Sequence, residues 1–425
     1  MDILTRIFEC ELPITEMKKI VKYISLVLVA LVTTGIYGQD QGFIYGEVST
    51  IDGNKYEGQI RWGKEEAYWH DIFNATKTSN EHFKYLSSSE KKDATQRDWG
   101  SIDWRIISIW SDEYSNVLHQ FSCRFGDISS IEVTGRNRLM LTLKDDSYME
   151  LSGGSNDVGT SVHVMDSELG EVKIRWDRID RVVFKETPKK LSERFGKPLY
   201  GEVETRQNGK FEGYIQWDHD ERMSQDKLDG KSKEGNMSIA FEKIAKIRNE
   251  GNSSYVELQS GRSMMISGTN DVNTGNRGII VSMDEVGRVD IPWNEFKEVT
   301  FEESKGSGQS YRSYGKPSKL EGKVVTQAEV EYTGIIVFDI DEALDIELIQ
   351  GKDDQVEYII PIRNINKITP RNYNYSTVEL RNGSKVLIGD SQDVSERNSG
   401  VLIFEKGAKA PIYVAWKKVS EIIFE

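Results

Sequence analysis

Cysteine, proline and histidine are scarce in this chain of 425 residues. Only two cysteines occur, Cys10 and Cys123, together with eight prolines and five histidines. Cys10 lies in the leader described below, so the processed chain can form no intrachain disulfide. No two histidines have a metal-ligand spacing such as HxxxH, which argues against a zinc site. We therefore expect the fold to depend on hydrophobic cores rather than on cross-links or bound metal.

Motifs for catalysis are also missing. The sequence has no nucleophile elbow, no P-loop and no dinucleotide fingerprint. Cys123 has no base close to it in sequence and follows an apolar pattern, which favours a buried, inert thiol. No two carboxylates are marked as a glycosidase pair. The sequence therefore predicts a protein that is not an enzyme and needs no cofactor, with a hydrolase whose site lies in residues 68–116 as an alternative.

Long apolar runs are absent apart from one near the N-terminus. From Met17 the sequence reads MKKIVKYISLVLVALVTTGIYGQD, in which three lysines precede an apolar stretch and then small and polar residues. This order is typical of a secretory signal peptide, and the apolar stretch is short for a membrane span. We expect residues 1–38 to be a leader removed between Gly35 and Gln39, with an uncleaved anchor as the alternative. The residues before Met17 are interpreted as an upstream extension.

Basic residues are outnumbered, and this excludes whole classes of partner. The chain carries 55 lysines and arginines against 69 aspartates and glutamates, a net charge of -14. Binding to nucleic acid or to an anionic membrane surface needs clustered cations that neutralise phosphates. We therefore expect no nucleic-acid partner. The only long apolar run lies in the leader, so we also expect no membrane span in the mature chain. We expect the exported protein in the periplasm, at the cell surface or outside the cell.

Short alternating segments around tight turns are abundant, and three of them share one pattern. They read YGEVSTIDGNKYEGQIRW, YGEVETRQNGKFEGYIQW and LEGKVVTQAEVEYTGIIVF. In each, two glycines lie twelve residues apart and an aromatic residue follows four residues later. These positions are Gly46, Gly58 and Trp62; Gly201, Gly213 and Trp217; and Gly322, Gly334 and Phe338. Alternation around a turn predicts a hairpin, and the constant spacing predicts an internal repeat.

The second half of each copy repeats as well. A strand, a turn, a strand and an Asp-Val loop precede two aromatic residues eight apart: Trp176 and Phe184, Trp293 and Phe301, Trp416 and Phe424. First halves close on FGDISSI, FEKIAKI and IRNINKI, which share their apolar spacing with the second-half endings. We therefore expect six half-units in three repeats, at residues 42–185, 196–302 and 315–425. Polar linkers at 185–198 and 302–317 should let the repeats reorient unless their surfaces pack.

The half-unit resembles the SH3-like and Sm-like small barrels. The resemblance rests on the turns DGNKYEG and NGKFEG, on second strands that end in IRW or IQW, and on the closing IPIRNINKI. It implies an all-β fold of three tandem repeats, each a pair of small SH3-like or Sm-like barrel or sandwich units. Pairing is expected because a unit of about 50 to 60 residues is marginally stable alone. The family implies protein, peptide or nucleic-acid contacts, and the acidic charge argues against the last.

One segment departs from the repeat. Residues 68–116 form an insertion in the first copy that is rich in aromatic side chains. We predict that it carries the specific binding patch, with contacts from Trp69, Phe73, Trp99 and Trp104. The recurring tryptophans and phenylalanines elsewhere are interpreted as core residues, since each can bury a large area. Exposed rings such as Trp69 and Trp104 would instead favour a carbohydrate- or cell-wall-binding protein.

An aspartate recurs in the Asp-Val loops, as Asp157, Asp271 and Asp393. An aspartate at a turn commonly accepts hydrogen bonds from backbone N–H groups, and we favour this structural role. The alternative is one cation site per copy, although the alternating acidic ligands of calcium loops are missing. The sequence as a whole predicts a non-catalytic, exported binding or structural protein of the bacterial cell envelope. Its partner would be an envelope protein or glycan.

Overall fold

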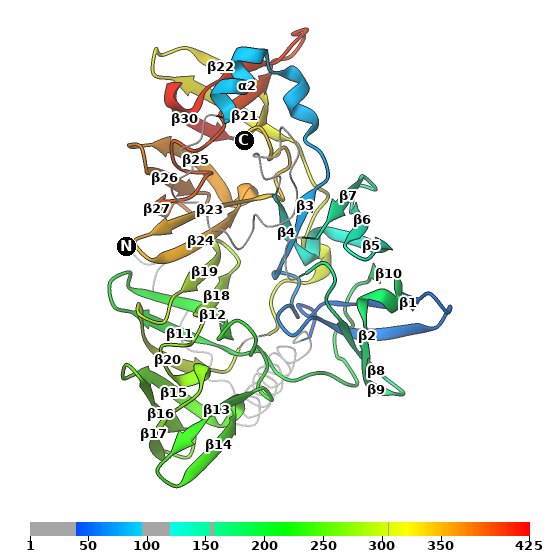
Figure 1. The fold of residues 1–425 in the computed structure, drawn as a ribbon, viewed down its shortest axis with the longest axis vertical. Helices are drawn as coiled ribbons and strands as arrows, with labels where there is room; N and C mark the ends of the chain where they lie inside the picture. Colours follow the sequence, from blue (N-terminus) through cyan, green and yellow to red (C-terminus); the bar gives the residue numbers. More distant parts are fainter. Residues whose placement is uncertain (1–39, 96–119, 154–156, 305) are drawn as a thin grey trace, which may run out of the picture.

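The chain folds almost entirely into antiparallel β-strands (Figure 1). The structure is a computed structural model that describes residues 40–95, 120–153, 157–304 and 306–425. Within these ranges the strands form two large sheets, neither closed into a barrel, and one short α-helix occurs, α2 (Ser88–Thr95). The all-β expectation is confirmed, whereas closed barrels are not seen. The expected leader, residues 1–38, lies outside the described residues.

The strands fall into three successive sets of ten. The first set contains β1 (Tyr45–Thr50), β2 (Lys55–Trp62), β3 (Ile72–Lys77), β4 (Gln120–Arg124), β5 (Ile128–Gly135), β6 (Arg138–Leu143), β7 (Tyr148–Ser152), β8 (Val162–Asp166), β9 (Gly170–Ile174) and β10 (Ile179–Phe184). The second contains β11 (Tyr200–Thr205), β12 (Lys210–Trp217), β13 (Lys227–Ser232), β14 (Gly235–Ala240), β15 (Ile244–Asn249), β16 (Ser253–Leu258), β17 (Ser263–Ser267), β18 (Ile279–Met283), β19 (Gly287–Ile291) and β20 (Phe296–Glu302). The third contains β21 (Leu320–Thr326), β22 (Glu331–Val337), β23 (Leu348–Asp353), β24 (Val356–Pro361), β25 (Ile365–Pro370), β26 (Tyr375–Leu380), β27 (Lys385–Gly389), β28 (Val401–Phe404), β29 (Ile412–Val414) and β30 (Val419–Phe424).

All three sets have the same strand order. The first is ordered β4-β3-β7-β6-β5-β10-β1-β2-β8-β9. The residue registers give β14-β13-β17-β16-β15-β20-β11-β12-β18-β19 for the second set and the equivalent order for the third. The first five strands of a set along the chain correspond, one by one, to its last five. Corresponding strands then lie at equal distances from the two ends of the spatial order. Each set therefore has an approximate internal twofold symmetry.

The two halves of a set exchange hairpins. The hairpin β13–β14 comes from the first half but pairs with β17 of the second half, through Lys231 and Ser267. The hairpin β18–β19 comes from the second half and pairs with β12 of the first, where Trp217 lies opposite Ile279. Each half of a set therefore contributes five strands, but neither half builds its part of the sheet from its own strands alone.

The recurring glycines lie where a neighbouring strand comes very close. A Cβ atom on Gly201 would lie 2.0 Å from the carbonyl oxygen of Thr300, and one on Gly213 would lie 2.4 Å from that of Ser282. Their counterparts in the other sets have equally short approaches, at Gly46, Gly58, Gly322 and Gly334. No side chain fits at such a distance, so the glycines allow β11 and β12 to pack beside β20 and β18.

The recurring aromatic residues form the centre of each set. Trp62, Trp217 and Phe338 are fully buried at or just after the end of the second strand. Each meets a second tryptophan edge to face, with ring centroids 6.0 to 6.3 Å apart: Trp62 with Trp176, Trp217 with Trp293 and Phe338 with Trp416. This geometry is the favourable one for aromatic pairs. The interpretation of these rings as packing residues is therefore confirmed.

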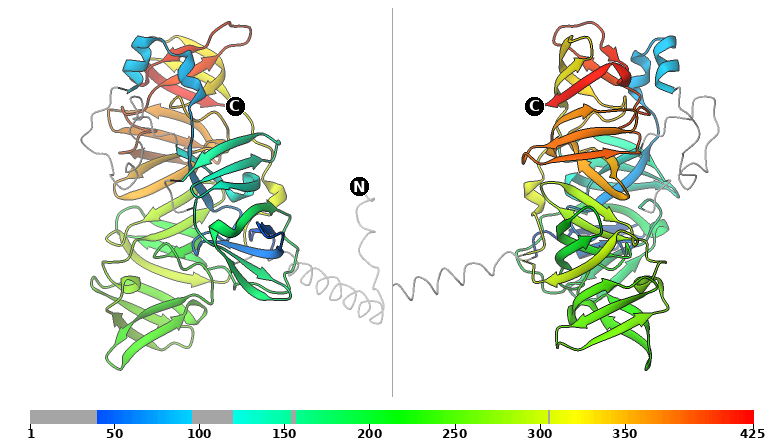
Figure 2. Two further views of the ribbon diagram at one scale, coloured as in Figure 1. Left: turned by 45° about the vertical axis from the view of Figure 1, so that its right-hand side comes forward. Right: turned by 90° about the vertical axis from the view of Figure 1, so that its left-hand side faces the viewer.

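The second and third sets join into one continuous sheet. Strand β19 pairs with β24, with Arg288 opposite Ile359 and Asp290 opposite Glu357. A single hydrophobic core extends through both sets. Figure 2 shows these two sets stacked in one column with the first set beside it. The first set has a core of its own, to which Tyr314 and Ile346 also belong.

The linker at 302–317 packs against the first set. Tyr314 is 3% exposed, and a Cβ on Gly126 would lie 2.4 Å from its ring. The ammonium of Lys144 lies 3.5 Å from the ring centroid of Tyr311 and donates a hydrogen bond of 2.8 Å to the carbonyl oxygen of Tyr314. These contacts hold the linker in place, so the expectation that it lets the sets reorient is not supported.

Candidate functional site

The predicted aromatic contacts that the structure describes are buried. Trp69 and Phe73 both have 0% exposure. The Trp69 ring lies 4.5 Å from that of Tyr311, and its indole N–H donates to Thr187 at 3.0 Å. Phe73 packs against Trp62 at 6.0 Å. Neither ring is accessible to a ligand, so the prediction of a binding patch at these two residues is not supported. Trp99 and Trp104 lie outside the described residues.

The described part of the insertion also packs inward. After β3 come a short 3-10 helix, η2 (Glu81–Tyr85), and then α2. Leu86 and Ala94 are buried against Val337, Ile340 and Leu402 of the third set. Figure 1 shows this segment running from the first set to the top of the third. Up to residue 95 the insertion therefore connects two strand sets.

The Asp-Val aspartates accept hydrogen bonds from backbone N–H groups. Asp157 accepts from Asn74 at 2.7 Å, Asp271 from Asp229 at 2.7 Å and Asp393 from Gln350 at 2.6 Å. Each donor is the third residue of the third strand of its set. The carboxylates thus satisfy equivalent backbone groups that the ladder leaves without a partner, as the structural interpretation predicted.

A second carboxylate recurs nine residues after the central aromatic residue of each set. The three are Asp71, Asp226 and Glu347. One oxygen of each accepts two consecutive backbone N–H groups at 2.7 to 2.9 Å, from residues 67 and 68, 222 and 223, and 343 and 344. The geometry fixes the turn that leads into the third strand. The repeated sequence spacing therefore has a repeated structural cause.

Each of these carboxylates also binds a cation from another strand set. Arg222 reaches Asp71 at 2.6 Å, Arg61 reaches Asp226 at 2.9 Å, and Lys77 reaches Glu347 at 2.6 Å. Lys77 also lies 3.1 Å from Asp341. Burial opposes the charge of Lys77, but Glu347 and Asp341 together raise its pKa. The three carboxylates occupy equivalent positions in their sets, whereas the cations that bind them come from positions that are not equivalent.

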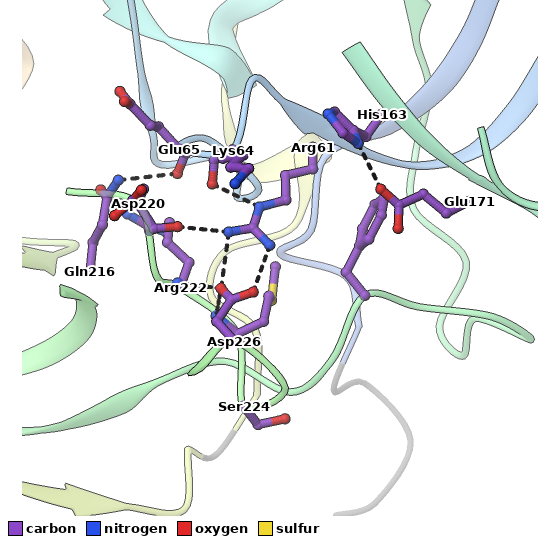
Figure 3. A network of polar contacts seen from close by, with 12 residues as sticks. Arg61, Lys64, Glu65, His163, Glu171, Gln216, Asp220, Arg222, Ser224 and Asp226 are labelled. Carbon is purple, nitrogen blue, oxygen red and sulfur yellow. Dashed lines mark hydrogen bonds and ion pairs between the residues drawn. The ribbon is translucent and has the colours of Figure 1, made fainter. Parts of the chain in front are cut away.

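The contact between the first and second sets is approximately symmetric. Residues 61 and 216 occupy equivalent positions, and each donates to a backbone carbonyl of the other set. Arg61 donates to Asp220 at 2.8 Å, and Gln216 donates to Glu65 at 3.3 Å. Figure 3 shows Arg61 reaching between Asp220 and Asp226, with Gln216 directed at Glu65 beside it. The first two sets therefore contact each other through the same surface.

A buried polar cluster lies within this contact. The rings of Tyr68 and His70 stack at 5.1 Å, and the Arg222 guanidinium lies 4.7 Å from the Tyr68 ring. Burial lowers the pKa of His70 well below its ordinary value and raises the pKa of Asp71. His70 is therefore neutral at neutral pH, and its Nε2 lies 3.4 Å from Arg222. Arg222 also donates to Gln216 at 2.7 Å, so the cluster is an enclosed network between the two sets.

Three acidic side chains gather in the turn after β12. Carboxylate oxygens of Asp218, Asp220 and Glu221 lie within 4.8 Å of one another. Arg277 lies 2.8 Å from Asp220 and 3.5 Å from Asp218. Burial raises the pKa of Glu221 to about 10, so this group carries a proton at neutral pH. One arginine and one bound proton together offset most of the charge of the cluster.

An open groove lies beside the second set, between the two linkers. Its volume is about 520 Å³, and Tyr200 and Phe301 contribute partly exposed rings to its lining, whereas Phe241 is buried. Charges of both signs surround it, including Arg194, Lys197 and Glu242. The groove offers aromatic area and paired charges without a nucleophile and base arranged for catalysis among its lining residues.

The comparisons with known proteins return no relative. No known family matches the chain, and neither a curated protein nor a solved structure is significantly similar to it. Among the described residues, no helix combines the length and the apolar character needed to cross a membrane.

Proposed function

We propose that the protein is a non-catalytic binding or structural protein, exported to the bacterial cell envelope, that acts through the surfaces of its β-repeats. The proposal depends mainly on the use of the three recurring carboxylates. Asp71, Asp226 and Glu347 each hold backbone N–H groups and a cation from another set. Groups committed in this way are not placed for proton transfer or nucleophilic attack. The network supports a role as a rigid scaffold.

The groove beside Tyr200 supports a polypeptide partner. Aromatic side chains with cations and carboxylates around them suit a segment that carries both apolar and charged residues. The SH3-like or Sm-like character of the half-units belongs to this proposal, since such modules commonly bind proteins and peptides. A glycan partner held by exposed tryptophans receives no support from Trp69, which is buried.

Capture from envelope extracts tests the proposal. Immobilised protein should retain a partner that is lost with Glu242→Arg, because this change reverses a charge in the lining of the groove. Glu396→Arg is the matched control, since Glu396 is also exposed and lies outside the groove lining. Equal capture by both variants would remove the groove from the proposal. Turnover of any member of an ester, peptide and glycoside panel would overturn the non-catalytic assignment.

A further inference from the structure

Within the described part of the chain, the strand sets have free edges as well as a joined one. The junction between the second and third sets pairs the last strand in the order of one set, β19, with the first strand in the order of the next, β24. The equivalents of β19 are β9 and β29, and the equivalents of β24 are β4 and β14. Each of these four strands has one paired neighbour among the described residues.

Two of the four edges are unsuited to a new partner. In β4, the residues from Phe121 to Arg124 are already buried. Beside β29, Pro411 occupies the position of Arg288 in β19, so this edge lacks a backbone donor where the junction has a paired residue. Proline at this place is a common means of preventing edge-to-edge pairing.

The remaining edges, β9 and β14, contain no proline and keep their outward backbone groups. Ser238 of β14 lies opposite Asp229, whose N–H donates to Asp271 and not to β14. This pair is therefore not hydrogen-bonded, and the N–H groups of Ser238 and of Asn236, two residues away, point outward from the ladder. The same alternation, counted from the bond between Gly63 N–H and Ser161, directs those of Glu171 and Lys173 outward. A Cβ on Gly170 at the start of β9 would meet no atom within 4 Å, which leaves room for a neighbour.

Side chains along the two edges match in the register of the junction. In that register Val172 lies opposite Met237, as Val289 lies opposite Tyr358. Val172 and Met237 are only partly buried, whereas Val289 and Tyr358 are buried by their pairing. Lys173 would lie opposite Asn236, in place of the like-charged pair of Asp290 and Glu357.

We propose that the protein associates with a second copy of itself through antiparallel pairing of β9 with β14. The interface joins different surfaces of the two copies, so it propagates head to tail into a ring or a filament. Figure 1 shows β9 at the lower end of the first set and β14 at the lower end of the second, so that the two edges belong to different sets. This inference rests on the proposed binding role and names one partner within it. A monomeric protein would overturn it without affecting capture by the groove.

Sedimentation velocity with edge variants tests the pairing. Glu171→Pro transfers the proline of β29 to β9, and Ser238→Pro removes an outward donor from β14. Each variant alone should be monomeric, whereas an equal mixture should form a dimer and nothing larger, because one copy supplies β14 and the other β9. Glu171→Ala is the control: it loses the 2.7 Å contact with His163 shown in Figure 3 but keeps the N–H, so it should associate as the wild type does.

Cysteine trapping checks the register. Chains with Glu171→Cys and chains with Ser238→Cys, mixed and oxidised, should form a disulfide-linked dimer, since directly opposite residues have Cβ atoms close enough for the bond. Lys173→Cys mixed with Ser238→Cys is offset by two residues and should cross-link poorly. The native Cys123 is fully buried and does not compete. Monomers at all concentrations, or equal cross-linking by both mixtures, would overturn the proposal.

Discussion

The Arg222–Asp71 pair offers the sharpest test of how the strand sets are held together. The two side chains are 1% and 4% exposed, and their charged atoms are 2.6 Å apart. In Arg222→Met, Asp71 loses the cation that opposes the rise of its pKa by burial, while Gln216 loses a donor at 2.7 Å. An uncompensated buried charge of this kind lowers the free energy of unfolding by about 3 to 5 kcal/mol.

A double-mutant cycle separates the ion pair from simple loss of packing. Asp71→Asn removes the charge but keeps an oxygen for the N–H groups of Ala67 and Tyr68. The double variant Asp71→Asn/Arg222→Met should therefore recover about 2 kcal/mol of the loss caused by Arg222→Met alone.

Urea titration followed by tryptophan fluorescence measures these differences. The control is Arg175→Met, because Arg175 and Asp177 form an exposed pair, with side chains 69% and 66% accessible. That change should cost less than about 1 kcal/mol. The reasoning is refuted if Arg222→Met costs no more than Arg175→Met, or if the two changes at 71 and 222 simply add.

Three further changes test other parts of the structure. Burial raises the pKa of Asp157 from 3.8 to about 7, so the unfolded carboxyl ionises first as the pH rises. Wild type should then lose stability relative to Asp157→Asn between about pH 4 and pH 7, and a constant difference in urea midpoint would contradict this. Gly126→Ala forces a Cβ to within 2.4 Å of the Tyr314 ring and should lower stability by about 1 to 3 kcal/mol, and in thermal melts the loss caused by Gly126→Ala should be smaller in a Tyr314→Ala background, where the clashing ring is gone. Trp217→Phe removes an N–H that donates to the carbonyl of Asp271 at 2.9 Å, and should cost about 1 to 3 kcal/mol in urea without changing the far-UV circular dichroism spectrum.

The repeat could be predicted from the sequence because local geometry requires particular residues. Gly201 and Gly213 recur since a crossing strand leaves no room for a Cβ, and Trp217 recurs since it fills the centre of a set. The hairpin exchange could not be predicted in the same way. Strands β12 and β13 present the same alternating pattern whichever half supplies their neighbours, so the pattern does not specify the partner.

The contacts between sets were missed for a different reason. Their acceptors do carry a signal, because Asp71, Asp226 and Glu347 each follow the central aromatic residue by nine positions. Their cations carry none: Arg61 and Lys77 come from unrelated positions of the first set, so no spacing relates one to the other. The aromatic content of 68–116 was interpreted as a recognition patch. Burial of Trp69 and Phe73 shows that aromatic richness alone does not distinguish a packed segment from an exposed one.

The exchange of hairpins has a consequence for how the chain is made. Strand β13 pairs with β17, and β12 pairs with β18. A ribosome adds roughly 5 to 20 residues per second, so several seconds separate the synthesis of β12 and β13 from that of their partners. Throughout that interval the nascent polypeptide holds the hairpins β11–β12 and β13–β14, whose neighbours have not yet been translated. Release of a chain that stops at the midpoint of a set would leave those edges without their native neighbours, and the cell would have to shield or degrade the fragment.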